Sequence, residues 1–220
     1  MATHIKPDKI YEGRATIRMF NVDNRDFMNQ VDDNYYGLAI CDPEYGINVN
    51  HNMGRRKGDK PSDYKKAEWD NSPVSKCQID EVIRVSKNQI VWGANHFISQ
   101  LPIDSPCWLV WDKKFSNDVT FASAELAWTS FNTTVKTYSK TSARVNGIHP
   151  TQKPPSLYRW ILKNYAEPNQ KIFDGWGGSM SIAIACWDLG FDLDIIELDE
   201  DYFNDAVKRF ETHIAQTQLF

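Results

Sequence analysis

Short apolar runs alternate with amphipathic stretches along most of the chain. Seven apolar runs predict buried strands, at 16–22, 37–41, 89–94, 107–111, 126–131, 171–175 and 193–198. Apolar residues at helical spacing predict helices at 77–86, 156–166, 179–190 and 200–216. Strands and helices in alternation are typical of a doubly wound, mostly parallel sheet, so the pattern predicts an α/β fold. In such sheets ligands bind at the carboxyl ends of the strands, and candidate functional residues are expected there.

The composition fits one soluble globular domain. The chain has 220 residues, of which 41% are hydrophobic and 13% aromatic, enough to bury a core. No apolar stretch reaches the roughly 18 residues of a membrane span, and the first residues, MATHIKPDKI, lack the apolar core of a signal peptide. We therefore expect a single domain over residues 1–220, in the cytoplasm and without a membrane partner. The four cysteines are scattered without a C-x-x-C spacing, which predicts reduced, mostly buried thiols and no metal site.

Charge is distributed unevenly along the chain. The net charge of −4 argues against indiscriminate binding to nucleic acid. Residues 51–66 nevertheless carry six Lys or Arg against two Asp, in a context of Gly, Pro and Ser that predicts a loop. Two interpretations of this basic loop stay open: a solvated surface segment, or an arm that contacts phosphates. In the second, the side chains expected on DNA are Arg55, Arg56, Lys57 and Lys60.

A glycine-rich turn follows the strand predicted at 171–175. The segment KIFDGWGGSMS passes from that strand through three glycines into a helix, and Glu197 lies near the end of the next strand. This layout is typical of a nucleotide-like ligand, because the glycines let the backbone approach closely and the acid accepts both ribose hydroxyls. Asp174 at the turn would repel a pyrophosphate and attract an ammonium, which favours S-adenosylmethionine over NAD. The alternative is a tight strand–helix turn without a ligand.

The segment LAICDPEYG, residues 38–46, brings a carboxylate, a proline and an aromatic ring to the end of a strand. The exocyclic amino group of a nucleobase is a poor nucleophile, because its lone pair is conjugated with the ring. Acceptors for both N–H bonds free that lone pair and stabilise the positive charge that develops on nitrogen. The Asp42 carboxylate and the Pro43 carbonyl are suitable acceptors, and the ring of Tyr45 offers a face for a flipped base. The alternative is a proline turn after a strand.

Four segments together resemble the amino-group DNA methyltransferases, specifically the β-class with circularly permuted motif order. They are DPEYG, RVSKNQIVWGANHF, HPTQKPPSLYRWIL and FDGWGGSMS followed by IIELDEDYF, and the similarity extends from about Thr16 to Phe210. The resemblance implies a Rossmann-like, circularly permuted, mostly parallel sheet of seven strands. It further implies methyl transfer from S-adenosylmethionine to a flipped base of double-stranded DNA, adenine N6 first and cytosine N4 as the alternative. Such a protein is expected to be prokaryotic or phage-encoded.

The resemblance also implies roles for individual residues. It places the target base among Asp42, Pro43 and Tyr45. In the permuted order, the strands predicted at 171–175, 193–198 and 16–22 lie next to one another in the sheet. Asp23, at the end of the last of these strands, would then face the cofactor adenine; a solvated acid is the alternative. The remaining residues of the expected cofactor site lie in the glycine-rich turn, the following strand end and the HPTQKP segment: Asp174, Gly175, Trp176, Gly177, Gly178, Ser179, Glu197, Thr151 and Lys153.

The sequence departs from the family pattern at two positions. Glu44 replaces the second proline of the catalytic motif, where its charge is expected to raise the pKa of Asp42 and weaken it as an acceptor. Met180 replaces a glycine of the cofactor turn, where its bulk is expected near the cofactor. Both departures keep open a degenerate relative that binds cofactor or DNA without catalysis. Cys107 follows a proline, as the nucleophile of cytosine-C5 methyltransferases does, but it begins a strand and is expected in the core.

Little of the chain is available for recognition of a target sequence. Members of the family usually place a recognition region before the HPTQKP segment, where only about 132–147 is available here. Recognition is expected to rest on that segment, on the basic loop 51–66, or on a second subunit or second copy of the chain. The sequence leaves these alternatives open.

Overall fold

The computed structural model describes residues 4–47, 69–102, 104–114, 122–140 and 152–217. The basic loop 51–66, with Arg55, Arg56, Lys57 and Lys60, and also Thr151, lie outside the described residues. The described part contains one nine-stranded sheet, in the order β1-β2-β9-β8-β3-β4-β6-β5-β7. The strands are β1 (Lys9–Tyr11), β2 (Ile17–Phe20), β3 (Tyr36–Cys41), β4 (Ser86–Trp92), β5 (Trp108–Asp112), β6 (Ala124–Thr129), β7 (Lys136–Ser139), β8 (Ile172–Asp174) and β9 (Leu193–Ile196).

The five central strands, from β2 to β4, are parallel, which confirms the doubly wound α/β fold. β9 lies between β8 and β2, so the neighbours expected from the permuted order are confirmed. The expected number of strands was wrong, because β1 and β7 are short strands at the two edges of the sheet. β7 takes up residues 136–139 of the segment considered for target recognition, and it pairs in parallel with β5.

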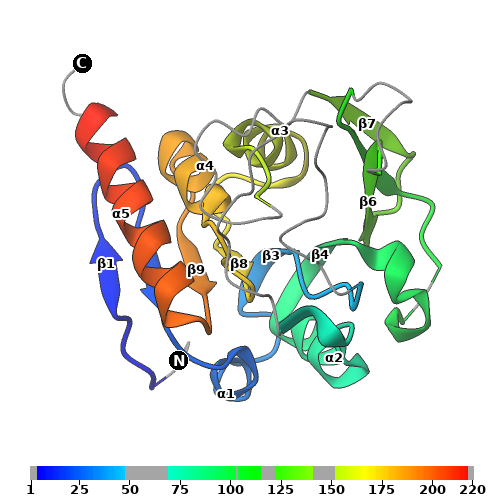
Figure 1. Ribbon diagram of the computed structural model, residues 1–220, viewed down its shortest axis with the longest axis horizontal. Helices are drawn as coiled ribbons and strands as arrows, with labels where there is room; N and C mark the ends of the chain where they lie inside the picture. The colour runs from blue at the N-terminus through cyan, green and yellow to red at the C-terminus, as the bar shows by residue number, and fades with distance from the viewer. Residues whose placement is uncertain (1–3, 48–68, 103, 115–121, 141–151, 218–220) are drawn as a thin grey trace, which may run out of the picture.

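Helices cover both faces of the sheet (Figure 1). α3 (Pro155–Tyr165), α4 (Ser181–Leu189) and α5 (Glu200–Thr217) pack on one face, and α1 (Asn24–Met28) and α2 (Lys76–Val85) on the other. Short 3-10 helices are η1 (Trp69–Asn71), η2 (Ala94–His96) and η3 (Ile98–Gln100). α4 ends at Gly190 as expected, where a φ of 79° suits a residue without a side chain. None of these helices is both long and apolar enough to cross a membrane.

The alternation of side chains along β3 explains why the sheet carries a core on each side. Leu38 and Ile40 pack into the cluster under α3, α4 and α5, whereas Ala39 and Cys41 pack into the cluster beside α1 and α2. All six residues of β3 are buried. A fully buried Leu or Ile stabilises a fold by about 1.5–3 kcal/mol, so this central strand is firmly held. The end of β3 is therefore a rigid support for residues 42–46.

The cysteines follow the expectation for three of the four positions. Cys41, Cys107 and Cys186 are buried free thiols, and Cys77 is exposed. Cys107 directly precedes β5 and lies 3.9 Å from the Tyr165 hydroxyl, so it belongs to the core at the entry end of its strand as expected.

Candidate active site

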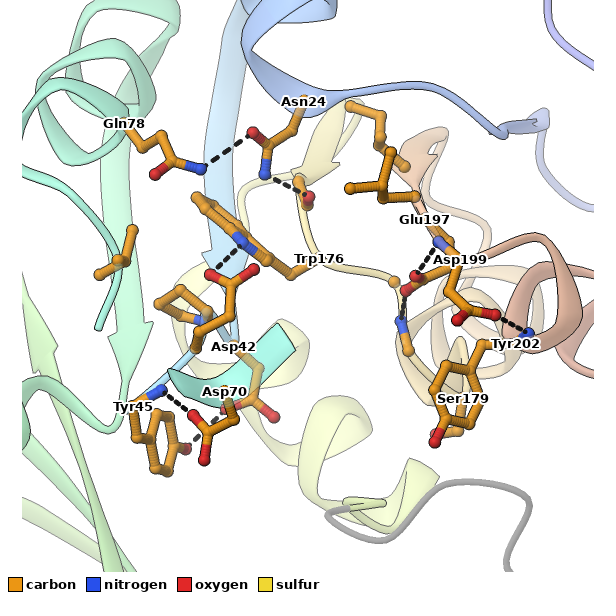
Figure 2. Close-up of a pocket in the computed structure, with 18 of the residues that line it drawn as sticks. Asn24, Asp42, Tyr45, Asp70, Gln78, Trp176, Ser179, Glu197, Asp199 and Tyr202 are labelled. Atoms are coloured by element: carbon orange, nitrogen blue, oxygen red, sulfur yellow. Dashed lines mark hydrogen bonds between the residues drawn. The ribbon is translucent and has the colours of Figure 1, made fainter. Parts of the chain in front are cut away.

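A cavity of about 480 Å³ lies at the carboxyl ends of the central parallel strands. It brings together most residues that the sequence singled out: Asp23, Asp42, Pro43, Tyr45, Lys153, Gly175, Trp176, Gly177, Gly178, Ser179 and Glu197 all line it. Figure 2 shows two groups of side chains in this cavity, with Trp176 between them: Asp42, Tyr45 and Asp70 on one side, and Ser179, Glu197, Asp199 and Tyr202 on the other. The two halves expected from the sequence therefore form one site.

The catalytic half is built on the end of β3. The Tyr45 hydroxyl donates to Asp42 Oδ1 at 2.6 Å, and the Tyr45 ring stacks on His96 with centroids 5.2 Å apart. The ring also lies against Gly93, where an added Cβ would come within 1.9 Å of a ring carbon. Only glycine leaves room for the ring there, and its φ of 68° suits glycine as well.

Asp70 of η1 holds the backbone of the catalytic turn. One of its carboxylate oxygens accepts the N–H groups of Tyr45 and Gly46, at 3.0 and 2.8 Å. The Val74 N–H donates to the Glu44 carbonyl at 3.0 Å, which ties the same turn to the chain after η1. Asp70 is almost fully buried. Sequence reasoning missed this role, because Asp70 lies in none of the strands, helices or motifs predicted from the sequence.

A buried lysine neutralises the Asp42 carboxylate. The side chain of Lys153 is only 1% exposed, and its Nζ lies 2.5 Å from Asp42 Oδ2 and 3.0 Å from Glu125 Oε2. Glu125 lies on β6, and its other oxygen pairs with Lys113. Burial raises the pKa of Glu125, but Lys153 and Lys113 outweigh that effect and bring it to about 2. The pKa of Lys153 is raised, because Asp42 and Glu125 together outweigh its burial.

The pKa of Asp42 corrects one expectation about Glu44. Burial raises this pKa, Lys153 opposes the rise, and the carboxylate that reinforces it is Glu125. Glu44 turns instead toward the cofactor turn, where its Oε2 accepts the indole N–H of Trp176 at 2.9 Å. Burial also raises the pKa of Glu44 itself. Glu44 thus links the two halves of the cavity.

The cofactor half is built by the turn after β8 and by the end of β9. The Gly178 N–H donates to Glu197 Oε2 at 2.6 Å, and the Asp199 N–H donates to Glu197 Oε1 at 2.8 Å. These bonds orient the carboxylate at the cavity wall, and burial raises its pKa to about 7. The Gly177 N–H donates to the Ile196 carbonyl, which fastens the turn to β9.

Asp23 lines the cavity at the start of α1. Its Oδ1 accepts the Arg25 N–H at 2.8 Å, as an N-cap does, and its Oδ2 pairs with the Arg25 guanidinium at 2.5 Å. The pKa of Asp23 is lowered, first of all by the hydrogen bonds from the Arg25 side chain. Neighbouring Asn24 donates to the Gly175 carbonyl at 3.1 Å, so the start of α1 also supports the cofactor turn.

Asp174 and Met180 are both buried at the turn. The Asp174 carboxylate lies beneath the turn and accepts the Trp176 N–H at 3.0 Å, and Asp174 is not among the described residues that line the cavity. Its expected contact with the ammonium of a ligand stays a prediction. Met180 adopts a φ of 51°, but its side chain is fully buried in the core under α4 rather than beside a cofactor. The positive φ explains why a glycine would also suit position 180.

The charges of the cavity fit a cationic nucleoside better than a phosphate. Among the described residues, two basic side chains, Arg25 and Lys153, line it against six carboxylates: Asp23, Asp42, Glu44, Asp70, Glu197 and Asp199. A carboxylate lining attracts a sulfonium or an ammonium and repels a pyrophosphate. The residues present therefore fit S-adenosylmethionine, with Glu197 placed to accept its ribose hydroxyls and with Asp23 on the same wall.

A family model described as DNA methylase, for N6 and N4 methyltransferases, matches residues 27–208. Searching the curated proteins gave no match to the chain.

Solved structures with the same fold include several DNA methyltransferases. The M1.HpyAVI complex with SAM is 17% identical, covers 88% of this chain and 99% of its own, and has a TM-score of 0.56. The PvuII DNA methyltransferase, which is cytosine-N4-specific, is 11% identical with a TM-score of 0.65, over 94% of this chain and 90% of its own. TTHA0409 from Thermus thermophilus, a putative DNA modification methylase complexed with S-adenosyl-L-methionine, is 12% identical with a TM-score of 0.56, over 89% and 95%. At these identities the likeness concerns the fold.

Proposed function

Because this chain belongs to the N6/N4 family of DNA methylases, we propose that it transfers a methyl group from S-adenosylmethionine to adenine N6 in double-stranded DNA. The observation that carries the proposal is the shared cavity: Asp42 at the end of β3 and Glu197 at the end of β9 line the same space. One wall offers acceptors for an amino group, and the other offers acceptors for ribose hydroxyls. Few other chemistries need both in one cavity.

The residues of the cavity divide the work as follows. Bound S-adenosylmethionine supplies an electrophilic methyl group on a sulfonium. Asp42 and the Pro43 carbonyl accept the two N–H bonds of the target amino group, which frees the nitrogen lone pair for attack on the methyl carbon. The proton lost by the amino group would pass along its hydrogen bond to Asp42 and from there to solvent, and the electron pair of the bond to the transferred methyl group would stay on the cofactor sulfur. The face of the Tyr45 ring turned away from His96 is the stacking face for the flipped base.

The choice of adenine over cytosine rests on the resemblance. An Asp at the start of the catalytic motif is commoner among adenine methyltransferases of this family, whereas Ser often marks the N4-cytosine enzymes. Cytosine N4 is the second candidate, because the structure of the cytosine-N4-specific PvuII enzyme matches this fold with a TM-score of 0.65. A relative that has lost catalysis is the third, since Glu44 interrupts the catalytic motif.

Contacts with DNA are assigned to Arg55, Arg56, Lys57 and Lys60 of the basic loop, whose charge suits a phosphate backbone. The cytoplasm is the proposed location. A second copy of the chain or a second subunit would supply target recognition if residues 132–147 do not.

Base analysis of methylated DNA tests the proposal. Unmodified DNA is incubated with the protein and isotopically labelled S-adenosylmethionine, and the DNA is then digested to nucleosides and separated. Label in N6-methyladenine is the expected result. Label in N4-methylcytosine would favour the second candidate, and cofactor binding without label in any nucleoside would favour the third.

A further inference from the structure

The two acceptor oxygens of Asp42 are both occupied before any base arrives. The Tyr45 hydroxyl donates to Oδ1 at 2.6 Å, and the Lys153 ammonium lies 2.5 Å from Oδ2. An incoming amino group must donate to one of these oxygens. Each oxygen keeps a further lone pair for that donor, but the buried Lys153 ammonium, a stronger donor than an amine, already neutralises the carboxylate and weakens it as an acceptor.

Lys153 has a second anionic partner within reach. Glu125 Oε2 lies 3.0 Å from Lys153 Nζ, and Lys153 Nζ also donates to the Tyr45 hydroxyl at 3.2 Å. Because the Lys153 side chain is 1% exposed, it cannot turn to water when it leaves Asp42. A buried ammonium without a carboxylate partner would cost several kcal/mol, so its route away from Asp42 must end on another anion.

Resting on the function proposed above, we propose that Glu125 is a positioning residue that draws Lys153 off Asp42 when the target base enters. Lys113 pairs with the other oxygen of Glu125 and tunes how strongly Glu125 attracts Lys153. Glu125 lies on β6 and its side chain is 17% exposed. Besides its pairs with Lys153 and Lys113, its Oε2 accepts the Tyr45 hydroxyl at 3.5 Å. It acts on Asp42 through Lys153 and also through its own negative charge.

Replacing Glu125 and replacing Lys113 are expected to shift the pKa of Asp42 in opposite directions. Replacing Glu125 with glutamine removes a repelling charge and leaves Lys153 fully on Asp42, so the pKa of Asp42 falls. Replacing Lys113 with glutamine strengthens the pull of Glu125 on Lys153, so the pKa of Asp42 rises. The charged and titratable groups that influence Asp42 from the surrounding elements are Lys153, Glu125, Tyr45, Tyr158, Cys41 and Asp174.

Single-turnover methyl transfer at saturating cofactor and DNA tests the competition. Glu125→Gln is expected to lower the rate constant by at least about tenfold, because Lys153 then stays fully on Asp42 and weakens it as an acceptor. Adding Lys153→Met to that variant removes the ammonium, and at a pH above the raised pKa of Asp42 the double variant is expected to be at least about threefold faster than Glu125→Gln alone. A merely structural role of Glu125 predicts that the double variant is no faster. Glu211→Gln, a carboxylate on α5 that bonds Tyr11, is the matched control.

Titration of Asp42 by carboxyl-carbon NMR supplies a readout that needs no turnover. A fall of the Asp42 pKa in Glu125→Gln and a rise in Lys113→Gln support the proposal, even if the double variant fails to fold. Shifts in the same direction, or a rate for Glu125→Gln within twofold of the wild type, would overturn it. If the wild-type protein methylates no DNA, the proposed function fails, while the titration still decides whether Glu125 and Asp42 share Lys153.

Discussion

Replacing Glu197 with glutamine is the sharpest test of how the cofactor site is built. Both carboxylate oxygens accept a backbone N–H, from Gly178 at 2.6 Å and from Asp199 at 2.8 Å. Each oxygen keeps a further lone pair, so the oriented carboxylate can also accept two ribose hydroxyls. Glutamine offers one oxygen instead of two and carries no charge. The variant therefore loses charge-assisted bonds to the cofactor and part of the support for the turn.

The expected loss of affinity follows from the strength of such bonds. A hydrogen bond to a charged group contributes about 1.5–3 kcal/mol, against about 0.5–1.5 kcal/mol for a neutral pair. Removing the charge from two bonds therefore costs about 2 kcal/mol, which corresponds to about a thirtyfold rise in Kd.

The pH dependence of binding gives a second signature. Burial raises the pKa of Glu197 to about 7, and the ionised form is the better acceptor of hydroxyl donors. Since the group ionises as the pH rises, cofactor binding should tighten with pH. The ionised fraction of a group with this pKa rises about tenfold between pH 6 and pH 8, so Kd should fall by about that factor. Glu197→Gln keeps only the slope that the cofactor's own groups contribute.

Isothermal titration calorimetry at pH 6, 7 and 8 measures both effects, and thermal unfolding checks that the variant keeps its fold. A variant Kd within threefold of the wild type at pH 8 would refute the assignment of Glu197 to the ribose. An identical pH slope in the two proteins would refute the role of its ionisation.

Three further experiments concern Asp70, Glu44 and the basic loop 51–66. Asp70→Ala leaves the N–H groups of Tyr45 and Gly46 without their acceptor, so the transfer rate should fall at least about tenfold while Kd for the cofactor stays within twofold. Equal losses in transfer rate and in cofactor affinity would contradict a role confined to the catalytic turn. Glu44→Ala removes the acceptor of the Trp176 indole and should raise that Kd by about threefold to tenfold in calorimetry, whereas Glu44→Gln should not. Neutralising Arg55, Arg56 and Lys57 of loop 51–66 together should weaken DNA binding and flatten its dependence on salt concentration. An unchanged salt slope would exclude the loop as a phosphate contact.

Most of the fold could be predicted, because short apolar runs that alternate with amphipathic stretches are typical of a parallel sheet covered by helices. The ends of β3, β8 and β9 were found from sequence, and so were the carboxylates that follow two of them, Asp42 and Glu197. The parallel arrangement then brings these strand ends to one edge of the sheet. β1 and β7 were missed because a three- or four-residue edge strand with exposed side chains leaves no apolar run.

The parts of the site that sequence reasoning missed depend on contacts between distant segments. Asp70 and Glu125 hold the catalytic turn and Lys153 from η1 and β6, and neither lies in a motif. The consequences of Glu44 and Met180 were also misjudged. A side chain's direction depends on tertiary packing, which turns Glu44 toward Trp176 and buries Met180 in the core.

Methyl transfer by an Asp42→Asn variant, measured beside cofactor affinity, tests the central claim most directly. Asparagine keeps the shape of the side chain but lacks the charge that stabilises a developing cation on the amino nitrogen. The predicted result is a transfer rate to DNA lower by about a hundredfold or more, with Kd for S-adenosylmethionine within twofold of the wild type. Transfer within tenfold of the wild-type rate would contradict the assignment of Asp42 as the acceptor for the target amino group.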